Sequence, residues 1–229
     1  MPKGLQPRPR RGPHHRAAAQ VGLPRALADE IRRTAKPGHT DEALSRASRA
    51  VALLSRGDAA QAFREAERAK AAAPRSGAVR EILALGYYGA ERWRDALREA
   101  QAYRRITGRK DQNHIIADSY RALGSPDKAV PVAEEALRAP IPEESRAEAA
   151  IVAASALADM GRFDQALAVL KRFPSRPEVG RSHDLRLWYV TGDVLARAGR
   201  RDEAAREFRR IVRYDRTAFD AVERLADLS

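Results

Sequence analysis

The sequence has no cysteine, two methionines and two tryptophans, and aromatic residues make up 6% of its 229 residues. The absence of cysteine excludes disulfide bonds and thiol chemistry, although it does not identify a compartment. No window is long and apolar enough to be a membrane-spanning helix. The basic N-terminus is not followed by a continuous apolar segment, so it lacks the pattern of a secretory signal. We therefore expect a cytoplasmic location, which is the default for such a chain.

The formal net charge of +12 is concentrated at the N-terminus. Residues 1–36 contain nine lysines and arginines but only two acids, Asp29 and Glu30. Residues 1–22 are rich in proline, glycine and arginine and have almost nothing to bury, which predicts a disordered basic arm. Such an arm binds polyanions without reading sequence. Its candidate polyanion-binding residues are Arg8, Arg10, Arg11 and Arg16. Arginine-rich composition is also typical of high-GC genomes, so the arm has two interpretations.

A regularly spaced set of alanines predicts the fold. Ala62, Ala96, Ala129, Ala166 and Ala204 lie 34, 33, 37 and 38 residues apart, and each opens the second helix of a pair. Alanine and leucine dominate the composition and β-branched runs are few, which favours helices over strands. A period in this range is typical of stacked helical hairpins. The sequence therefore predicts an all-α, right-handed α-solenoid of about five hairpins with a C-terminal capping helix.

The expected organisation has three parts: the arm at 1–22, a short docking helix and linker at 23–39, and a repeat domain at 40–229. Leu23, Leu27 and Ile31 recur every four residues, which predicts the docking helix at about 24–35. The paired helices are expected at 40–56 and 58–74, 77–89 and 92–107, 110–123 and 126–138, 143–160 and 163–173, and 185–198 and 201–214. A last helix is expected at 217–228.

The fifth pair contains Trp188, Gly192, Gly199, Ala204 and Phe208 at the offsets of a known repeat signature. This pattern resembles the tetratricopeptide repeat over residues 43–229, with threonine at the position where the family usually has leucine. The second and third pairs also resemble an actinobacterial group of tetratricopeptide proteins of unassigned function. In the family, the first helix of each repeat lines a concave groove that binds a partner. Carried over to this sequence, the groove residues are Glu81, Tyr88, His114, Asp118, Arg121, Asp159, Arg186, Tyr189, Asp193 and Arg197.

Catalytic and metal motifs are not found. The sequence contains no G-x-x-x-x-G-K-[ST], G-x-G-x-x-G or H-E-x-x-H motif. His114 and Asp118 lie four residues apart on an expected helix, but two ligands without a third do not make a zinc site. We expect them to form a solvated pair. We expect no enzyme activity, no cofactor and no metal.

Two function classes remain open from the sequence. The first is a protein-interaction scaffold, in which a partner segment contacts Tyr88, Arg121, Tyr189 and Arg197, since tyrosine and arginine are typical interface anchors. The alternative is association with RNA or a ribonucleoprotein through the N-terminal arm. No RNA-binding motif or aromatic stacking platform accompanies the arm.

Overall fold

The computed structural model describes residues 22–173 and 182–228, which form twelve α-helices and no strand. A short helix, α1 (Arg25–Thr34), comes before the first pair. The paired helices are α2 (Thr40–Ser55) and α3 (Ala59–Ala72), α4 (Gly77–Gly89) and α5 (Trp93–Thr107), α6 (Asn113–Ala122) and α7 (Pro126–Leu137), α8 (Glu143–Asp159) and α9 (Phe163–Lys171), and α10 (Ser182–Arg197) and α11 (Arg201–Tyr214). The described chain ends with α12 (Ala221–Ala226).

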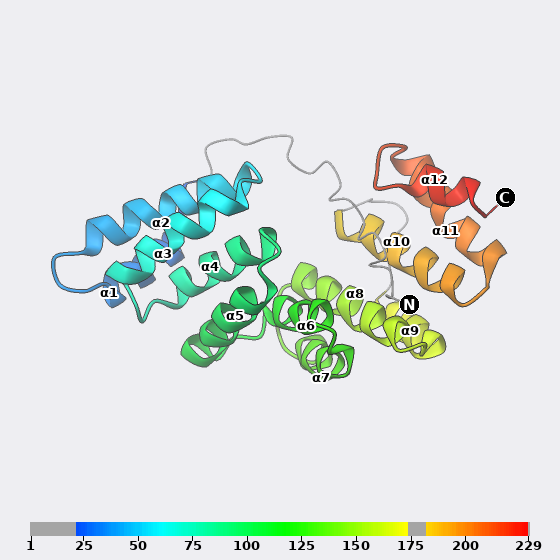
Figure 1. The fold of residues 1–229 in the computed structure, drawn as a ribbon, viewed down its shortest axis with the longest axis horizontal. Coiled ribbons are helices and arrows are strands. Elements are labelled where there is room, and N and C mark those ends of the chain that lie inside the picture. The colour runs from blue at the N-terminus through cyan, green and yellow to red at the C-terminus, as the bar shows by residue number, and fades with distance from the viewer. Residues whose placement is uncertain (1–21, 174–181, 229) are drawn as a thin grey trace.

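The five pairs stack into an open arch (Figure 1). Each first helix packs against the next first helix, so that α2 contacts α4, α4 contacts α6, α6 contacts α8 and α8 contacts α10. Each second helix packs within its own pair and against the first helix of the next pair. Figure 1 shows α4, α8 and α10 along the inner side of the arch, with α5, α7, α9 and α11 outside them. The predicted all-α solenoid is confirmed.

The recurring alanines are completely buried between packed helices. All five of them, at positions 62, 96, 129, 166 and 204, have 0% exposure. Helices approach to about 8–10 Å only where the contact residues are small. Neighbouring larger side chains, such as Leu167 and Phe208, are also buried and fill the space between layers. The spacing of one small residue type therefore sets the position of each pair in the stack.

The turn within each pair is built in the same way five times. In the first pair, Gly57 N donates to Leu54 O and Asp58 N donates to Leu53 O, both at 3.0 Å. The same two bonds recur in the other four turns. The residue at the Gly57 position has a positive φ in every turn, and it is glycine in four of them, at positions 57, 124, 161 and 199. The exception is Glu91, which adopts φ 58° between α4 and α5.

Helix α1 closes the N-terminal end of the stack. It packs against α2 and α4, and its Ile31 side chain is completely buried. The Glu30 carboxylate accepts hydrogen bonds from Gly77 N at 2.8 Å and from Ser76 Oγ at 2.5 Å. Both donors lie at the start of α4, where a carboxylate satisfies free N–H groups and is favoured by the helix dipole.

The buried side chains form two apolar clusters that change over within α6. Ile115 and Ile116 belong to the N-terminal cluster, whereas Ala117 belongs to the C-terminal one. The N-terminal half also contains a buried charge, because the Glu99 side chain on α5 is only 1% exposed. Arg80 Nη1 and Lys70 Nζ donate to its two oxygens, at 2.5 Å and 3.2 Å. Burial alone would raise the pKa of Glu99, but these hydrogen bonds hold it below the ordinary glutamate value.

The C-terminal helix is shorter than the predicted segment 217–228. Asp215 Oδ1 accepts hydrogen bonds from the backbone N and the hydroxyl of Thr217, at 2.8 Å and 2.7 Å, which favours a turn. Phe219 then adopts a φ of 58°, which is not helical. These local bonds delay the helix until Ala221, although the apolar spacing over the segment suits a longer one.

Candidate functional site on the inner wall

The first helices α4, α6, α8 and α10 form a surface that we call the inner wall. A continuous series of hydrogen bonds and ion pairs runs along it, which we call the polar ladder: Tyr88, Asp118, Arg121, Asp159, Arg197, Asp193 and Arg224. Tyr88 Oη on α4 donates to Asp118 Oδ2 on α6 at 2.6 Å. Arg121 Nη1, one turn further along α6, donates to Asp118 Oδ1 at 2.7 Å. The Nε of Arg121 donates to Asp159 Oδ2 at the end of α8, at 2.6 Å. Three successive first helices are thus joined by side-chain contacts.

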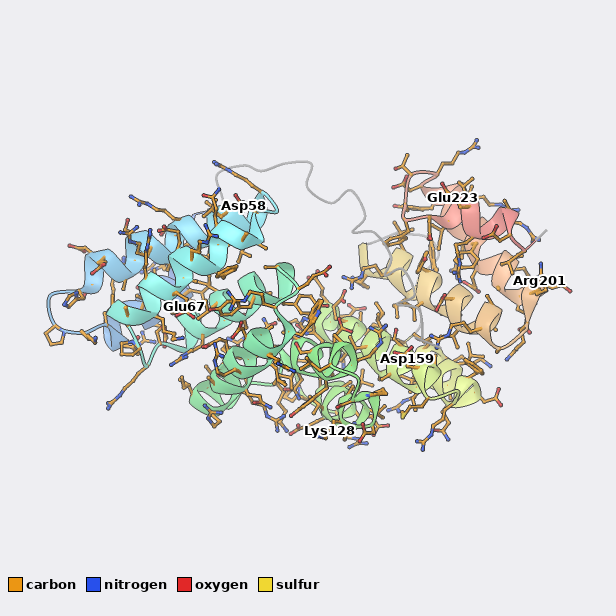
Figure 2. The ribbon with its side chains drawn as sticks, viewed as in Figure 1. Asp58, Glu67, Lys128, Asp159, Arg201 and Glu223 are labelled. Carbon is orange, nitrogen blue, oxygen red and sulfur yellow. The ribbon has the colours of Figure 1, made fainter. Side chains whose placement is uncertain are left out.

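The ladder continues to the C-terminal end of the arch. Arg197 Nη2 on α10 donates to Asp159 Oδ1 at 3.2 Å and to the backbone oxygen of Ala158 at 2.8 Å. Arg197 also lies 3.7 Å from Asp193, which accepts a 2.6 Å hydrogen bond from Arg224 on α12. Figure 2 shows Asp159 at the end of α8 near α10, while Lys128 of α7 lies at the outer edge.

The ladder keeps its charges because each one has an opposite partner. The Asp118 side chain is 8% exposed and Arg121 is 25% exposed. Burial would lower the pKa of Arg121, but the nearby carboxylates of Asp118 and Asp159 raise it above the ordinary arginine value. Partly buried pairs of this kind are screened less by salt than exposed ones. The ladder therefore fixes the wall, and its carboxylates are already engaged.

The first helices α4 and α8 of the wall contain acidic side chains in addition to those of the ladder. Helix α8 contains four acids and one arginine. We call Glu81, Glu144 and Glu148 the acidic centre. Glu148 pairs with Arg186 Nη2 of α10 at 2.6 Å, and Glu81 accepts a 2.7 Å hydrogen bond from Gln112.

Both buried carboxyls of the acidic centre titrate above their ordinary range. Burial raises the pKa of Glu148, and the negative charges of Glu144 and Asp118 raise it further against the pull of Arg186. Burial also raises the pKa of Glu81, with a further contribution from Asp111 and an opposing one from the Gln112 hydrogen bond. Burial is the largest cause of both shifts and disfavours the charged carboxylates, and a cation brought close to them would oppose that effect.

His114 and Asp118 do not form the solvated pair expected from the sequence. Asp118 is only 6% exposed and is held by Tyr88 and Arg121. His114 Nδ1 lies 3.0 Å from the backbone oxygen of Asp111 instead. Burial lowers the pKa of His114 to about 4, and the positive charge of Arg186 adds to this shift against the effect of the Asp111 hydrogen bond. The imidazole is therefore neutral at pH 7.

Tyr189 lies in the core and not on the open wall. Its side chain is 5% exposed, and its ring packs 5.6 Å from Phe208 and 4.9 Å from Phe219. The Tyr189 hydroxyl donates to Asp220 Oδ1 at 2.6 Å. The turn before α12 therefore covers this side chain, so we omit Tyr189 from the surface that a partner could contact.

Sequence reasoning missed two residues of the wall. Arg224 completes the ladder from α12, and Gln112 holds Glu81 from the loop before α6. Both residues lie outside the first-helix positions that the family resemblance implies. The apolar spacing that indicated a C-terminal helix is the only signal that placed Arg224 near the fifth pair. Arg8, Arg10, Arg11 and Arg16 lie outside the described residues, and their polyanion-binding role stays a prediction.

Within residues 22–173 and 182–228, no group of three or more histidine, aspartate or glutamate residues is arranged to hold a metal ion. Over the same two ranges, every helix is too short or too polar to cross a bilayer.

Comparison with solved structures places this arch among known repeat proteins. TTC0263 from Thermus thermophilus, a tetratricopeptide protein, superposes with a TM-score of 0.65 at 20% identity, covering 81% of this chain and 98% of that one. YrrB, described as a tetratricopeptide protein with an unusual peptide-binding site, gives 0.53 at 18% identity, covering 86% of this chain and 96% of that one. Human IFIT1, solved as a dimer with m7Gppp-AAAA, superposes with a TM-score of 0.62 at 16% identity, covering 80% of this chain and 45% of that one.

Sequence comparison agrees with the fold. Residues 114–219 match the family model described as tetratrico peptide repeat. No curated protein matches the chain significantly. The matched range covers the third to fifth pairs, and the first two pairs repeat the same architecture, including the same turn. Residues 114–219 therefore contain tetratricopeptide repeats, and the described chain as a whole has the fold of tetratricopeptide proteins.

Proposed function

We propose that this protein is a non-enzymatic scaffold that binds an extended, basic segment of a partner protein along the inner wall. The observation that carries the proposal is the acidic centre in an otherwise strongly basic chain. Glu81 and Glu148 are held close to other negative charges and are partly removed from water. A lysine or arginine of a partner would relieve this repulsion, which favours basic segments over acidic ones.

The polar ladder supports this role by fixing the wall before the partner arrives. Tyr88, Asp118, Arg121, Asp159 and Arg197 are already held by one another, so their side chains lose little freedom on binding. Preorganisation of this kind increases affinity because less ordering remains to be done. In this proposal the ladder gives shape and register to the groove, and the acidic centre attracts the partner.

The fold by itself does not choose the ligand. Among its structural neighbours, one is described with a peptide-binding site and another was solved with capped RNA. The acidic centre disfavours RNA on the inner wall because phosphates would meet carboxylates. RNA association through the N-terminal arm stays the alternative, with Arg8, Arg10, Arg11 and Arg16 as its candidate contacts. We also propose a cytoplasmic location.

The test removes the charge of the acidic centre and keeps its shape. Glu81→Gln with Glu148→Gln should weaken binding of lysine-rich peptides by about tenfold or more, as measured by fluorescence anisotropy. Both carboxyls have raised pKa values, so neutralising them should not lower the melting temperature. The matched control is Glu134→Gln with Glu203→Gln on the second helices α7 and α11, which should leave binding unchanged.

Two results would contradict the proposal. The first is loss of peptide binding in the control pair with full binding in the inner-wall pair, which would place the site on the outer side. The second is a lysine-rich peptide that binds no better than a glutamate-rich peptide of the same length. If partners captured from a lysate disappear after nuclease treatment, the arm-based alternative is correct instead.

A further inference from the structure

A second candidate site lies away from the inner wall, in a cleft between α10 and α11 with a volume of about 640 Å³. Arg206, Arg209, Arg210 and Arg213 of α11 line it together with Trp188 and Tyr214. We call this the arginine cleft. Its volume is within the roughly 300–1,000 Å³ that is usual for small-molecule sites.

The four arginines line one side of α11 as two pairs with four-residue spacing, Arg206 with Arg210 and Arg209 with Arg213. Like charges on one helix face repel one another, so this face is unfavourable unless anions approach it. Elsewhere in the chain, buried arginines have close partners, as with the 2.5 Å contact between Arg80 and Glu99. Arg206 and Arg210 have only distant partners, Glu203 at 3.9 Å and Glu207 at 3.8 Å.

Arg209 and Arg213 have still less compensation. Neither forms an ion pair with another residue in the described ranges, and both side chains are exposed. Their guanidinium groups therefore point charge and hydrogen-bond donors at solvent from the rim of the cleft. An arginine fork matches the geometry of a phosphate or carboxylate, which can accept two parallel hydrogen bonds.

Aromatic rings form the rest of the cleft. Trp188 is 2% exposed, and the Arg210 guanidinium carbon lies 4.0 Å from the centroid of its ring. Tyr214 is 51% exposed and meets Trp188 edge to face at 6.3 Å. The Trp188 Nε1 group is buried and has no hydrogen-bond acceptor among the described residues. The cleft thus presents donors and an exposed aromatic face.

Among the described residues, Glu207 is the only acid lining the cleft, so the net charge of this lining is positive. Its side chain is 26% exposed and belongs to the same helix as the arginines. Burial raises the pKa of Glu207, while Arg210 and Arg206 oppose this shift. One carboxylate does not offset four guanidinium groups, and the potential in the cleft favours anions.

We propose that the arginine cleft binds the phosphate groups of a nucleotide, with the phosphates between Arg209 and Arg213 and the base against Tyr214. The combination of unpaired guanidinium groups with an exposed ring distinguishes this ligand from an inorganic anion or an acidic peptide. Arginine supplies charge-assisted bonds to phosphate, and a planar base is a good partner for an aromatic face. The arginine cleft lies on a different surface from the inner wall, so this proposal does not depend on the proposed partner binding.

The test uses ATP as the probe, with tripolyphosphate and adenosine as its two halves. Trp188 reports from inside the cleft, so its fluorescence in a Trp93→Phe background, together with calorimetry on the unaltered chain, follows binding. ATP should saturate a single site, tripolyphosphate should bind more weakly, and adenosine should not bind detectably. Tyr214→Leu should weaken ATP binding and leave tripolyphosphate binding unchanged, because only ATP uses the ring.

Variants that remove charge test whether ATP binds in the arginine cleft. Arg209→Gln with Arg213→Gln should weaken ATP binding by about tenfold or more. The matched control is Arg64→Gln with Arg94→Gln, two arginines on α3 and α5 outside the cleft, which should leave it unchanged. Circular dichroism should show an intact fold in both double variants. Equal losses in both variants, or no saturation by ATP, would overturn the proposal. Binding of a hexaglutamate peptide as tight as that of ATP would identify an acidic-peptide site and overturn it too.

One more titration distinguishes a free nucleotide from RNA as the ligand. A short single-stranded oligoribonucleotide is titrated under the conditions used for ATP. A free nucleotide is indicated if ATP binds more tightly per site than the oligoribonucleotide. If the oligoribonucleotide binds more tightly and the Arg209 and Arg213 variant abolishes this binding, the phosphate chemistry stands and its source is RNA.

Discussion

Replacing Glu91 by glycine should stabilise this protein. Glu91 occupies the one turn position at which the other four pairs have glycine, with a φ of 58° against 75–81° in the glycine turns. A side chain in this left-handed region costs roughly 1–2 kcal/mol because Cβ crowds the backbone. Glycine removes this cost but adds roughly 0.5–1 kcal/mol through the greater freedom of the unfolded chain. The difference between the midpoints of these two ranges gives a net gain of about 0.75 kcal/mol for Glu91→Gly.

The assay is thermal unfolding followed by circular dichroism in the far ultraviolet, which reports helix content. For a chain of this size, about 1 kcal/mol raises the melting temperature by roughly 2–4 °C. Hydrogen exchange gives a local readout, since the Glu91 and Arg92 amides donate to Tyr88 and Tyr87 in the turn. These amides should exchange more slowly in the variant.

Two controls separate backbone strain from the lost carboxylate. Glu91→Ala removes the charge and keeps the strain, so it should leave the melting temperature nearly unchanged. Gly199→Ala places a side chain at φ 77° and reverses the same two effects, so it should cost about 0.75 kcal/mol. A Glu91→Gly variant that is no more stable than the wild type, alongside a destabilised Gly199→Ala, would refute the strain argument for this turn.

Three further outcomes follow from burial and charge. Leu167→Ala should cost about 2–5 kcal/mol in urea unfolding, because Leu167 is 5% exposed between layers. Glu99→Gln should cost about 3 kcal/mol, because Lys70 and Arg80 lose a buried partner. The lowered pKa of Glu99 means that its contribution is present above the ordinary glutamate pKa and is lost as pH falls below it, so the gap between wild type and variant should narrow at low pH. Lowering the pH from about 6.5 to about 4 should reduce the free energy of unfolding by up to about 3 kcal/mol. The reason is that His114 has a pKa of about 4 in the folded protein, so the unfolded chain takes up the proton at a higher pH. In a pH series of melting temperatures, His114→Gln should make this decline smaller.

The helices and turns could be predicted from the sequence because their signals are local. The predicted segments 77–89 and 201–214 coincide with α4 and α11. Helical periodicity within each segment and the glycine at four of the five turns depend on neighbours within a few residues. The family resemblance is confirmed by the match over residues 114–219 and by the shared fold.

The inner wall could be placed by register, but its contacts could not. Arg121 reaches Asp159 across 38 residues of sequence, and both residues could have pointed at solvent. Register also assigned Tyr189 to the groove, and only the turn at Phe219 shows that it is covered. Which charges remain uncompensated depends on side-chain conformations in three helices at once. The arm and the cytoplasmic location stay predictions.

The change from one apolar cluster to the other at α6 divides the arch into two separately packed parts. At α6 the buried contacts change from the N-terminal cluster to the C-terminal cluster. The ladder joins α4 to α6 through a single tyrosine hydroxyl, that of Tyr88. By contrast, arginine–aspartate ion pairs join α6 to α8 and α8 to α10. We therefore expect bending of the arch to be concentrated at α6, while the ion pairs of the ladder keep the wall from α6 to α10 fixed. The span between α2 and α10 then measures how wide the molecule is open, and a ligand that bridges both parts would act as a clasp.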